Sequence, residues 1–339
     1  MMDQLEINEQ LDKLMAQTES DIEKLFAKRL KSILSQMSNM YLKLSHKGQQ
    51  PSWTDVNKYN RFQQEMKRIA QQLDGDYKKI IKEITKSHQT LYVEKYLMMA
   101  YLFSMSNAEE LGFQIPSESM IQTALINPVE YLTLPKIFEF HRRELIRKLN
   151  IEIAQSLQQG VGYSDLAYRI QQVLGFSRKK AILVARTEGG RVRSAADLQV
   201  EEDIKDKVNL DKVWMSSLDL RVRSSHRKLD GQKADNKGYF HHLGLKGKGP
   251  HMWGVANMDI QCRCTVIYLI DGKYPEYRRG RDYMDSGYQK QLANRIEKYM
   301  GDEGITYKQA LKKAQKELKP PSTVIPFVDF KDWKRQFVA

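Results

Sequence analysis

Apolar residues recur at steps of three and four over the first 44 residues, and this pattern constrains the fold more than any other feature. Among them are Leu11, Leu14, Ile22, Phe26, Ile33, Met37, Met40 and Leu44. Because lysines and glutamates fill the intervening positions, the spacing predicts one long amphipathic helix. Such a helix is unstable alone and must bury its apolar stripe, either in an intramolecular bundle or against another protein.

Turn-forming residues divide the next part of the chain into shorter helical runs. A break is expected at 47–52, followed by helical runs over 62–73 and 77–105 with a possible break at Asp74-Gly75-Asp76 between them. The segment 112–116 and the Asn127-Pro128 and Leu134-Pro135 steps predict a connector, because the residue before a proline disfavours the helical conformation. We place a domain boundary there.

Glycines and serines mark the expected helix ends in the following region. Gly160 or Gly162 is a candidate helix C-cap, and Ser164 and Ser177 are candidate N-caps. The expected helices cover 138–157, 165–174 and about 178–200.

After residue 212 the pattern changes to short β-like runs at 213–217 and 265–270, on either side of a Gly/Lys-rich loop at 237–250. Helical runs return at 288–299 and 307–318, and the chain closes with Lys319-Pro320-Pro321 and a short extended stretch. The predicted fold is therefore mainly α with a small α+β domain. It comprises an elongated helical part at 1–135, a compact domain with short strands at 136–272 and a basic helical tail at 273–339.

The charge balance is strongly positive. The 339 residues carry a net charge of +13, and 29% of them are charged. An excess of this size attracts polyanions, chiefly nucleic acid, through counterion release. The alternative is a protein whose lysine-rich helix faces only keep it solvated.

The cysteines and the apolar runs indicate in which compartment the protein folds. Cys262 and Cys264 are the two cysteines, and with one residue between them they are poorly placed for a disulfide, which agrees with folding in a reducing cytoplasm. The N-terminus lacks the basic and apolar regions of a secretory signal. The apolar stretch at Tyr96–Met105 is shorter than the ~20 residues of a membrane helix, so it predicts a buried helix and no membrane-spanning segment.

Three sequence blocks occur in a fixed order. They are Ala185-Arg186-Thr187-Glu188, a block from Trp214 through Asp219, Arg221, Arg223 and His226 to Leu229-Asp230-Gly231, and Gln261-Cys262-Arg263-Cys264-Thr265. The set resembles the phage head-morphogenesis domain of Mu F-like minor head proteins, over roughly 135–272. The resemblance implies structural roles for Arg186, Thr187, Glu188, Trp214, Asp219, His226, Leu229, Asp230, Gly231, Cys262, Arg263 and Cys264.

The resemblance also implies a function. Members of this family lie inside the phage procapsid in few copies, attached to the portal protein. We therefore expect a minor capsid protein that is made in the host cytoplasm and enters the virion near the portal. Its expected partners are the portal protein, major capsid or scaffold proteins, and packaged or exiting double-stranded DNA. A scaffold-like assembly factor without DNA contact is an alternative.

Basic residues crowd the motif region and are candidates for contacting nucleic acid. They are Arg221, Arg223, Arg227, Lys228, Lys233, Lys237, Lys246 and Lys248. Tyr239, Phe240 and Trp253 lie among them and could stack on bases. For Arg221 and Arg223 we favour a structural role, pairing with buried carboxylates such as Asp219, Asp230 or Glu188, whereas the lysines favour a polyanion or partner surface.

The cysteines and histidines raise the question of zinc, which takes four N or S ligands. Candidate ligands are His226, Cys262 and Cys264 with His241, His242 or His251. Similar proteins show further metal-like residues where this chain has Ser225 and Asp259. We therefore predict no metal and no cofactor, with two packed cysteines and His226 hydrogen-bonded to the 229–231 turn.

Enzymatic activity is the remaining alternative. Arg186, Thr187 and Glu188, with Ser216 and Glu201, loosely resemble elements of ADP-ribosyltransferases, and a nuclease or a His226–Asp230 hydrolase pair is conceivable. No P-loop, H-E-x-x-H or Gly-x-Ser-x-Gly motif occurs. Glu188 beside Arg191 is most simply an intrahelical ion pair. We therefore predict a protein that is not an enzyme.

Overall fold

The computed structural model describes residues 3–44, 54, 60–106, 111–126, 133–270 and 272–338. This part of the chain holds ten helices and six short strands, and the strands pair as three two-stranded antiparallel sheets. The predicted fold class, mainly α with a small α+β part, is confirmed. No helix within these ranges is long and apolar enough to cross a membrane.

The chain forms two compact units. We call Glu6–Val200 the helical unit, and Glu201–Ala339 with Asp3–Leu5 the motif unit. The chain passes from one to the other inside helix α6 (Tyr163–Ile204). The boundaries expected from the sequence, at 135/136 and 272/273, stay a prediction.

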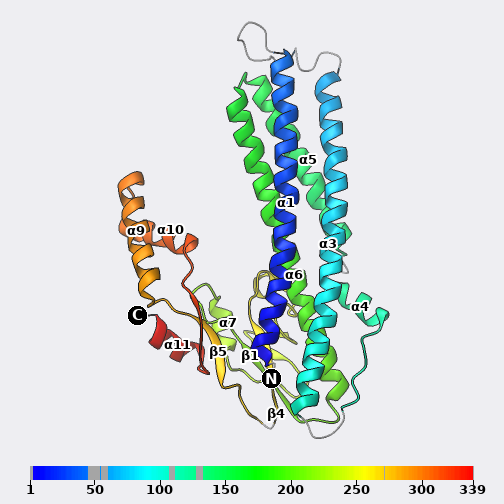
Figure 1. Ribbon diagram of the computed structural model, residues 1–339, viewed down its shortest axis with the longest axis vertical. Helices are drawn as coiled ribbons and strands as arrows, with labels where there is room; N and C mark the ends of the chain where they lie inside the picture. Colours follow the sequence, from blue (N-terminus) through cyan, green and yellow to red (C-terminus); the bar gives the residue numbers. More distant parts are fainter. Residues whose placement is uncertain are drawn as a thin grey trace. The chain divides into compact units, whose positions relative to one another are not determined.

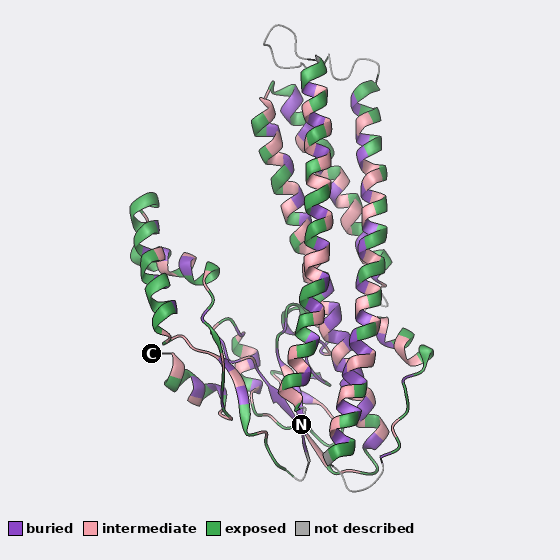
Figure 2. Cartoon of the chain, in the orientation of Figure 1, coloured by how far each residue is buried: buried purple, intermediate pink, exposed green. Residues whose placement is uncertain are grey.

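Long helices build the helical unit (Figure 1). They are α1 (Gln4–Leu44), α3 (Arg61–Ser106), α5 (Leu134–Gln158) and α6, with the short α4 (Glu118–Leu125). Buried residues recur along each helix between exposed ones (Figure 2). They form one shared core, in which the Tyr77 ring packs edge-on against Phe26 at 6.2 Å and Phe138 at 6.0 Å. The first helix is confirmed, and its apolar stripe is buried within the unit.

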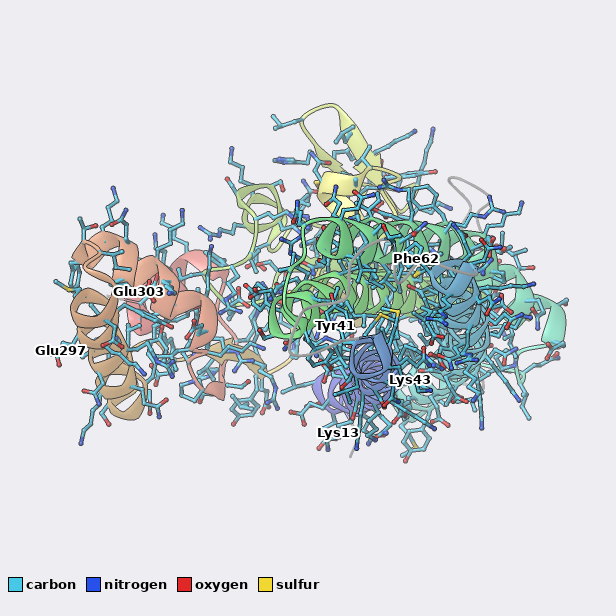
Figure 3. The ribbon with its side chains drawn as sticks, turned by 90° about the horizontal axis from the view of Figure 1, so that it is seen from above. Lys13, Tyr41, Lys43, Phe62, Glu297 and Glu303 are labelled. Atoms are coloured by element: carbon cyan, nitrogen blue, oxygen red, sulfur yellow. The ribbon has the colours of Figure 1, made fainter. Side chains whose placement is uncertain are left out.

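Figure 3 turns the molecule to be seen from above and labels two apolar and two basic residues of the helical unit. Tyr41 and Phe62 are buried, whereas Lys13 and Lys43 are exposed. The predicted break at 47–52 and the Asn127-Pro128 step lie outside the described residues. Leu134-Pro135 is not a connector, because Pro135 stands in the first turn of α5, where its missing N–H is tolerated.

The expected break at Asp74-Gly75-Asp76 is wrong, because α3 runs through it without interruption. Arg29 of α1 donates to the Asp76 carboxylate at 3.0 Å and to the Gln72 side chain at 2.6 Å. Asp74 pairs with Lys78 one turn later at 2.8 Å. These contacts and the flanking core residues offset the roughly 1 kcal/mol that a glycine costs inside a helix.

The expected division of 163–200 into two capped helices is also wrong. Ser177 is buried inside α6 and begins no helix. The reason is a continuous apolar face, whose buried members are Leu166, Ile170, Leu174, Ala181 and Ala185. The preceding helix ends as expected, with Gly160 in the left-handed region at φ 64.

The motif unit begins with a two-stranded antiparallel sheet. Strand β1 (Leu210–Met215) pairs with β4 (Thr265–Ile270), with Trp214 opposite Val266, which confirms both predicted strands. The loop between them is more structured than expected. It holds α7 (Ser224–Leu229), the hairpin of β2 (Phe240–His242) and β3 (Leu245–Gly247), and α8 (Ala256–Asp259).

The tail contains the predicted helices and elements that the sequence did not reveal. Helices α9 (Ser286–Glu303) and α10 (Tyr307–Glu317) are confirmed. Unexpected are the pairing of β5 (Tyr277–Arg281) with β6 (Ser322–Pro326) and the final helix α11 (Phe330–Phe337). Trp333 of α11 is fully buried beside Leu218, so the tail shares a core with the motif region.

Candidate functional site

A buried carboxylate organises the centre of the motif unit. Asp230 accepts hydrogen bonds from the Ser216 backbone N–H at 2.8 Å and its hydroxyl at 2.9 Å. It also accepts from the Phe330 N–H at 2.8 Å and from Arg278 at 2.5 Å. Arg278 donates in turn to the Ser216 carbonyl at 2.6 Å. Because a buried charge needs such partners, Asp230 ties the residue that follows β1 to β5 and α11.

The turn after Asp230 lies against β1. Gly231 adopts φ 78, the left-handed conformation expected for it, and donates to the Trp214 carbonyl at 2.9 Å. Trp214 donates back to the Gln232 carbonyl at 2.9 Å. This exchange fixes Trp214, which is fully buried, in the middle of the unit.

Aromatic rings surround Trp214. His226 lies edge-on to it at 5.7 Å, Phe240 at 5.4 Å and Trp253 at 5.9 Å between ring centroids. A Cβ atom at Gly247 would lie 2.7 Å from the Trp253 ring, so this close approach requires glycine. Beyond these aromatic rings, the Arg223 guanidinium lies 3.4 Å from the His226 Nε2 atom.

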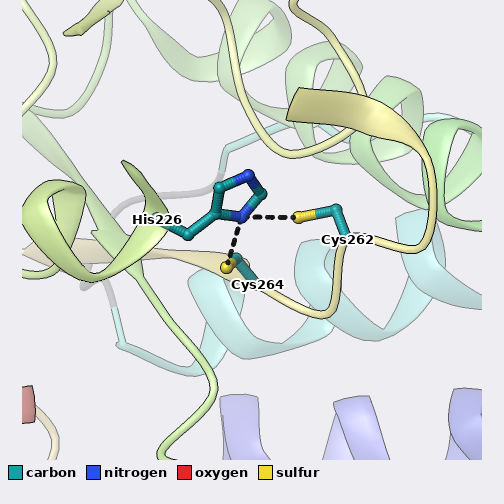
Figure 4. A group of neighbouring side chains, drawn as sticks. All are labelled: His226, Cys262 and Cys264. Atoms are coloured by element: carbon teal, nitrogen blue, oxygen red, sulfur yellow. Dashed lines mark hydrogen bonds between the residues drawn. The ribbon is translucent and has the colours of Figure 1, made fainter. Parts of the chain in front are cut away.

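Two sulfur atoms lie against that ring (Figure 4). The His226 Nδ1 atom is 3.3 Å from Cys264 Sγ and 3.5 Å from Cys262 Sγ, and all three residues are buried. His226 was expected to bond to the 229–231 turn. This is wrong, because Asp230 is occupied by Ser216, Arg278 and Phe330, and the ring nitrogen faces the cysteines instead.

The two thiols differ in acidity. Hydrogen bonds from the Cys264 thiol and from His226 hold the pKa of Cys262 well below its ordinary value. Burial raises the pKa of Cys264 well above its ordinary value. The pair therefore loses a first proton readily and a second one only with a stabilising positive charge nearby.

Asp259 shapes the adjoining loop. Its carboxylate accepts from the backbone N–H groups of Trp253 at 3.1 Å, Gly254 at 2.7 Å and Val255 at 3.2 Å. Burial nevertheless raises its pKa. His251, just before this loop, is buried and has φ 61, an uncommon conformation for a residue with a side chain.

The arginines of the motif bind backbone carbonyls. Arg221 donates to Gln315 at 2.8 Å, and Arg223 donates to Met258 at 3.4 Å and to Ile260. The expected pairing of Arg221 and Arg223 with buried carboxylates is thus wrong.

Those carboxylates have other partners. Asp219 pairs with Arg263 at 3.0 Å, Asp230 with Arg278, and Glu188 with Arg191 at 2.8 Å. Arg278 belongs to the tail, outside all three sequence blocks, so no local signal could have identified it.

The remaining basic candidates differ in how far their charge is neutralised. Arg227 donates to the Leu220 carbonyl at 2.6 Å, and Lys233 pairs with Asp211 at 2.6 Å. Lys228 and Lys237 are exposed, as are Lys246 and Lys248, whose ammonium groups lie 4.8 and 5.6 Å from the Tyr239 ring centroid. The hairpin therefore presents an exposed group of cations around one aromatic ring.

The upstream block lies on α6 in the helical unit. Arg186 pairs with Glu19 of α1. Arg191 pairs with Glu188, as predicted, and also donates to the Ala124 carbonyl at 2.8 Å. These residues connect α6 to α1 and α4.

Comparison with known proteins decides the family. The model for Phage Mu protein F like protein matches residues 147–267. The chain is 41% identical over 279 residues to minor head protein GP7 of Bacillus phage SPP1, which covers 82% of this chain and 90% of that protein. The chain belongs to the Mu F-like family of phage minor head proteins.

More distant relatives of this Mu F-like protein are matched only in part. It is 31% identical over 206 residues to the NAD(+)--arginine ADP-ribosyltransferase EFV of Enterococcus faecalis, covering 59% of this chain and 42% of that protein. It is 27% identical over 130 residues to an uncharacterized protein of Haemophilus influenzae, covering 26% of the latter. No solved structure matches.

Proposed function

We propose that this protein is a minor capsid protein, incorporated during head assembly, that contacts the portal and the packaged or exiting DNA. It would act by binding and not by turnover. Membership of the Mu F-like family and the similarity to a minor head protein along most of both chains support the role in the head. The observation that carries the DNA contact is the exposed lysine group on the β2–β3 hairpin.

We call Lys237, Lys246 and Lys248 the hairpin lysines. All are exposed, and among the described residues none forms an ion pair with a carboxylate, unlike Lys233 with Asp211. A lysine that is not already neutralised gains most from a phosphate, because the contact releases a counterion from DNA. Tyr239 adds an aromatic ring of the kind on which unpaired bases stack.

The test is DNA binding at two salt concentrations. Double-stranded DNA of arbitrary sequence should bind at low salt, with affinity falling steeply as salt rises. Replacing the hairpin lysines by alanine should reduce the log–log salt slope by about 0.9 for each lost phosphate contact.

A matched control removes the same charge elsewhere. Lys24, Lys78 and Lys205 are exposed and pair with Asp21, Asp74 and Glu202. Replacing these three by alanine should leave binding largely intact. An equal loss of DNA affinity in both triple variants would mean that binding depends on net charge alone and not on the hairpin lysines. DNA binding that does not weaken as salt rises would contradict the proposal.

The portal contact can be tested in assembled particles. The protein is rich in lysine, so an amine-reactive cross-linker applied to purified procapsids should join it to its neighbours. Cross-links to the portal protein are expected. Cross-links only to major capsid or scaffold proteins would favour the scaffold-like alternative.

The similarity to an ADP-ribosyltransferase makes an enzyme the second candidate. Against it, Glu188 is held by Arg191 and Arg186 by Glu19, so both side chains already have partners within the bundle. We expect no transfer from NAD+ and no DNA cleavage by the purified protein. Either activity, lost in Glu188→Gln, would show that the protein is an enzyme.

A further inference from the structure

The cluster of His226, Cys262 and Cys264 has no part in the proposed DNA or portal contacts. The one nitrogen and two sulfur donor atoms lie within 4.8 Å of one another, and all three side chains are buried (Figure 4). Packing of small apolar groups would account for the buried cysteines. It does not account for an imidazole nitrogen directed at both sulfur atoms.

The spacing of these atoms matches the edges of a tetrahedral metal site. Bonds of about 2.3 Å to sulfur and about 2.0–2.1 Å to nitrogen place a thiolate and an imidazole nitrogen roughly 3.5 Å apart. The separations from His226 Nδ1 are 3.3 and 3.5 Å. An ion would therefore fit with little movement of the side chains.

The backbone holds the two thiols on one side. In an extended segment, side chains two residues apart point the same way and the one between them points away. Arg263 is the residue between, and its guanidinium pairs with Asp219. Its carbonyl accepts the Ser217 hydroxyl at 2.6 Å. The contacts of Arg263 with Asp219 and Ser217 therefore keep Cys262 and Cys264 facing His226.

Three further histidines of the motif unit lie outside this donor cluster. His241 is exposed and His242 only partly buried, whereas His251 is buried. The Asp259 carboxylate fixes the loop that follows His251 by accepting three backbone N–H groups.

We propose that His226, Cys262 and Cys264 bind one zinc ion that stabilises the motif unit. One imidazole nitrogen and two thiolates are donors that zinc prefers. This revises the metal-free prediction, which counted Ser225 and Asp259 as replaced ligands, because the structure brings three donors together.

The test begins with the reduced full-length protein. Purified without chelator, it should contain about one zinc ion per chain, and a chelator should lower its melting temperature. Cobalt(II) added in place of zinc should produce sulfur-to-cobalt charge-transfer absorption and the visible bands of a tetrahedral ion. Cys262→Ser and Cys264→Ser should each abolish the charge-transfer signal or sharply reduce it, and His226→Ala should weaken binding.

The exposed histidine offers a matched control. His241→Ala should retain the metal and the cobalt spectrum, since its ring lies outside the cluster and pairs with Asp235. If the cysteine variants do not fold, the wild-type cobalt spectrum still reports directly whether sulfur is bound. Failure of the reduced wild type to take up zinc or cobalt would overturn the proposal. So would metal binding that persists in both cysteine variants.

Discussion

At the scale of single residues, buried side chains with specific neighbours decide the stability of each unit. Asp230 is the clearest example, because one carboxylate binds Ser216 after β1, Arg278 of β5 and Phe330 of α11. Trp214 and His88 are two further residues whose surroundings lead to measurable expectations.

Trp214 is fully buried and contacts His226, Phe240 and Trp253 edge-on. Trp214→Ala should therefore destabilise the motif unit by ~3–5 kcal/mol, through lost burial and the cavity left behind. Denaturant unfolding of the purified variant measures this. Met300→Ala, at an exposed position of α9, should change stability little. A Trp214→Ala protein as stable as the wild type would contradict the placement of this residue.

His88 should make the helical unit sensitive to acid. Burial lowers the pKa of His88 from 6.5 to about 4, and its Nε2 atom lies 3.1 Å from the Ala185 carbonyl. The ring stays neutral when folded, while the unfolded chain takes up a proton below about pH 6.5. Stability should thus fall as the pH drops from about 6.5 to about 4, by up to roughly 3 kcal/mol.

The variant His88→Gln tests this expectation. Urea unfolding at several pH values should give a stability gap between wild type and variant that narrows as the pH falls. His242→Gln, at a partly exposed ring of the motif unit, is the control and should leave the pH dependence unchanged. A constant gap across this range would mean that His88 does not titrate differently in the folded state.

At the scale of elements, helices α3 and α6 run through glycines at which the local sequence suggests breaks. Gly75 and Gly175 lie inside these helices, and a Cβ atom at either would meet nothing within 4 Å. Gly75→Ala and Gly175→Ala should each therefore stabilise the protein by up to about 1 kcal/mol, since alanine favours the helix.

Gly160 provides the opposite case for the same measurement. It too has open space around its Cα, but its φ is 64, so alanine is strained there. Thermal unfolding should show Gly160→Ala to be destabilising while the two helix variants are stabilising. Destabilisation by Gly75→Ala or Gly175→Ala would indicate that the helix is interrupted at that position.

At the scale of the whole molecule, the described residues divide into two compact units, and each contains buried hydrophobic clusters. One joins α1, α3, α5 and α6, and the others lie within the motif unit and its tail. Units with their own cores can unfold independently, so calorimetry should resolve two transitions.

Core substitutions assign these transitions. Trp214→Ala should lower one, and Ile153→Ala, in the bundle core, should lower the other. A chelator should affect only the transition that Trp214→Ala lowers, if zinc binds in the motif unit. A single transition, shifted equally by both substitutions, would show that the units unfold as one.

The sequence alone was sufficient for features that depend on local periodicity and on its motifs. The spacing of apolar residues predicted α1, α5, α9 and α10, and two short β-like runs predicted β1 and β4. The three blocks predicted the family, which the comparisons confirm. These signals are short-range, so they can be read without knowing what each segment packs against.

Where local and long-range interactions favour different structures, only the tertiary structure decided which one formed. Burial of core residues keeps α3 and α6 helical through Gly75 and Gly175. The extended stretch after Pro321 becomes strand β6 because it pairs with β5. Likewise, Asp230 pairs with Arg278, which is 48 residues away in the sequence. His226 contacts the sulfur atoms of Cys262 and Cys264, which are 36 and 38 residues away. The free energy of a buried charge or donor depends on which groups surround it in space, and sequence spacing does not specify those groups.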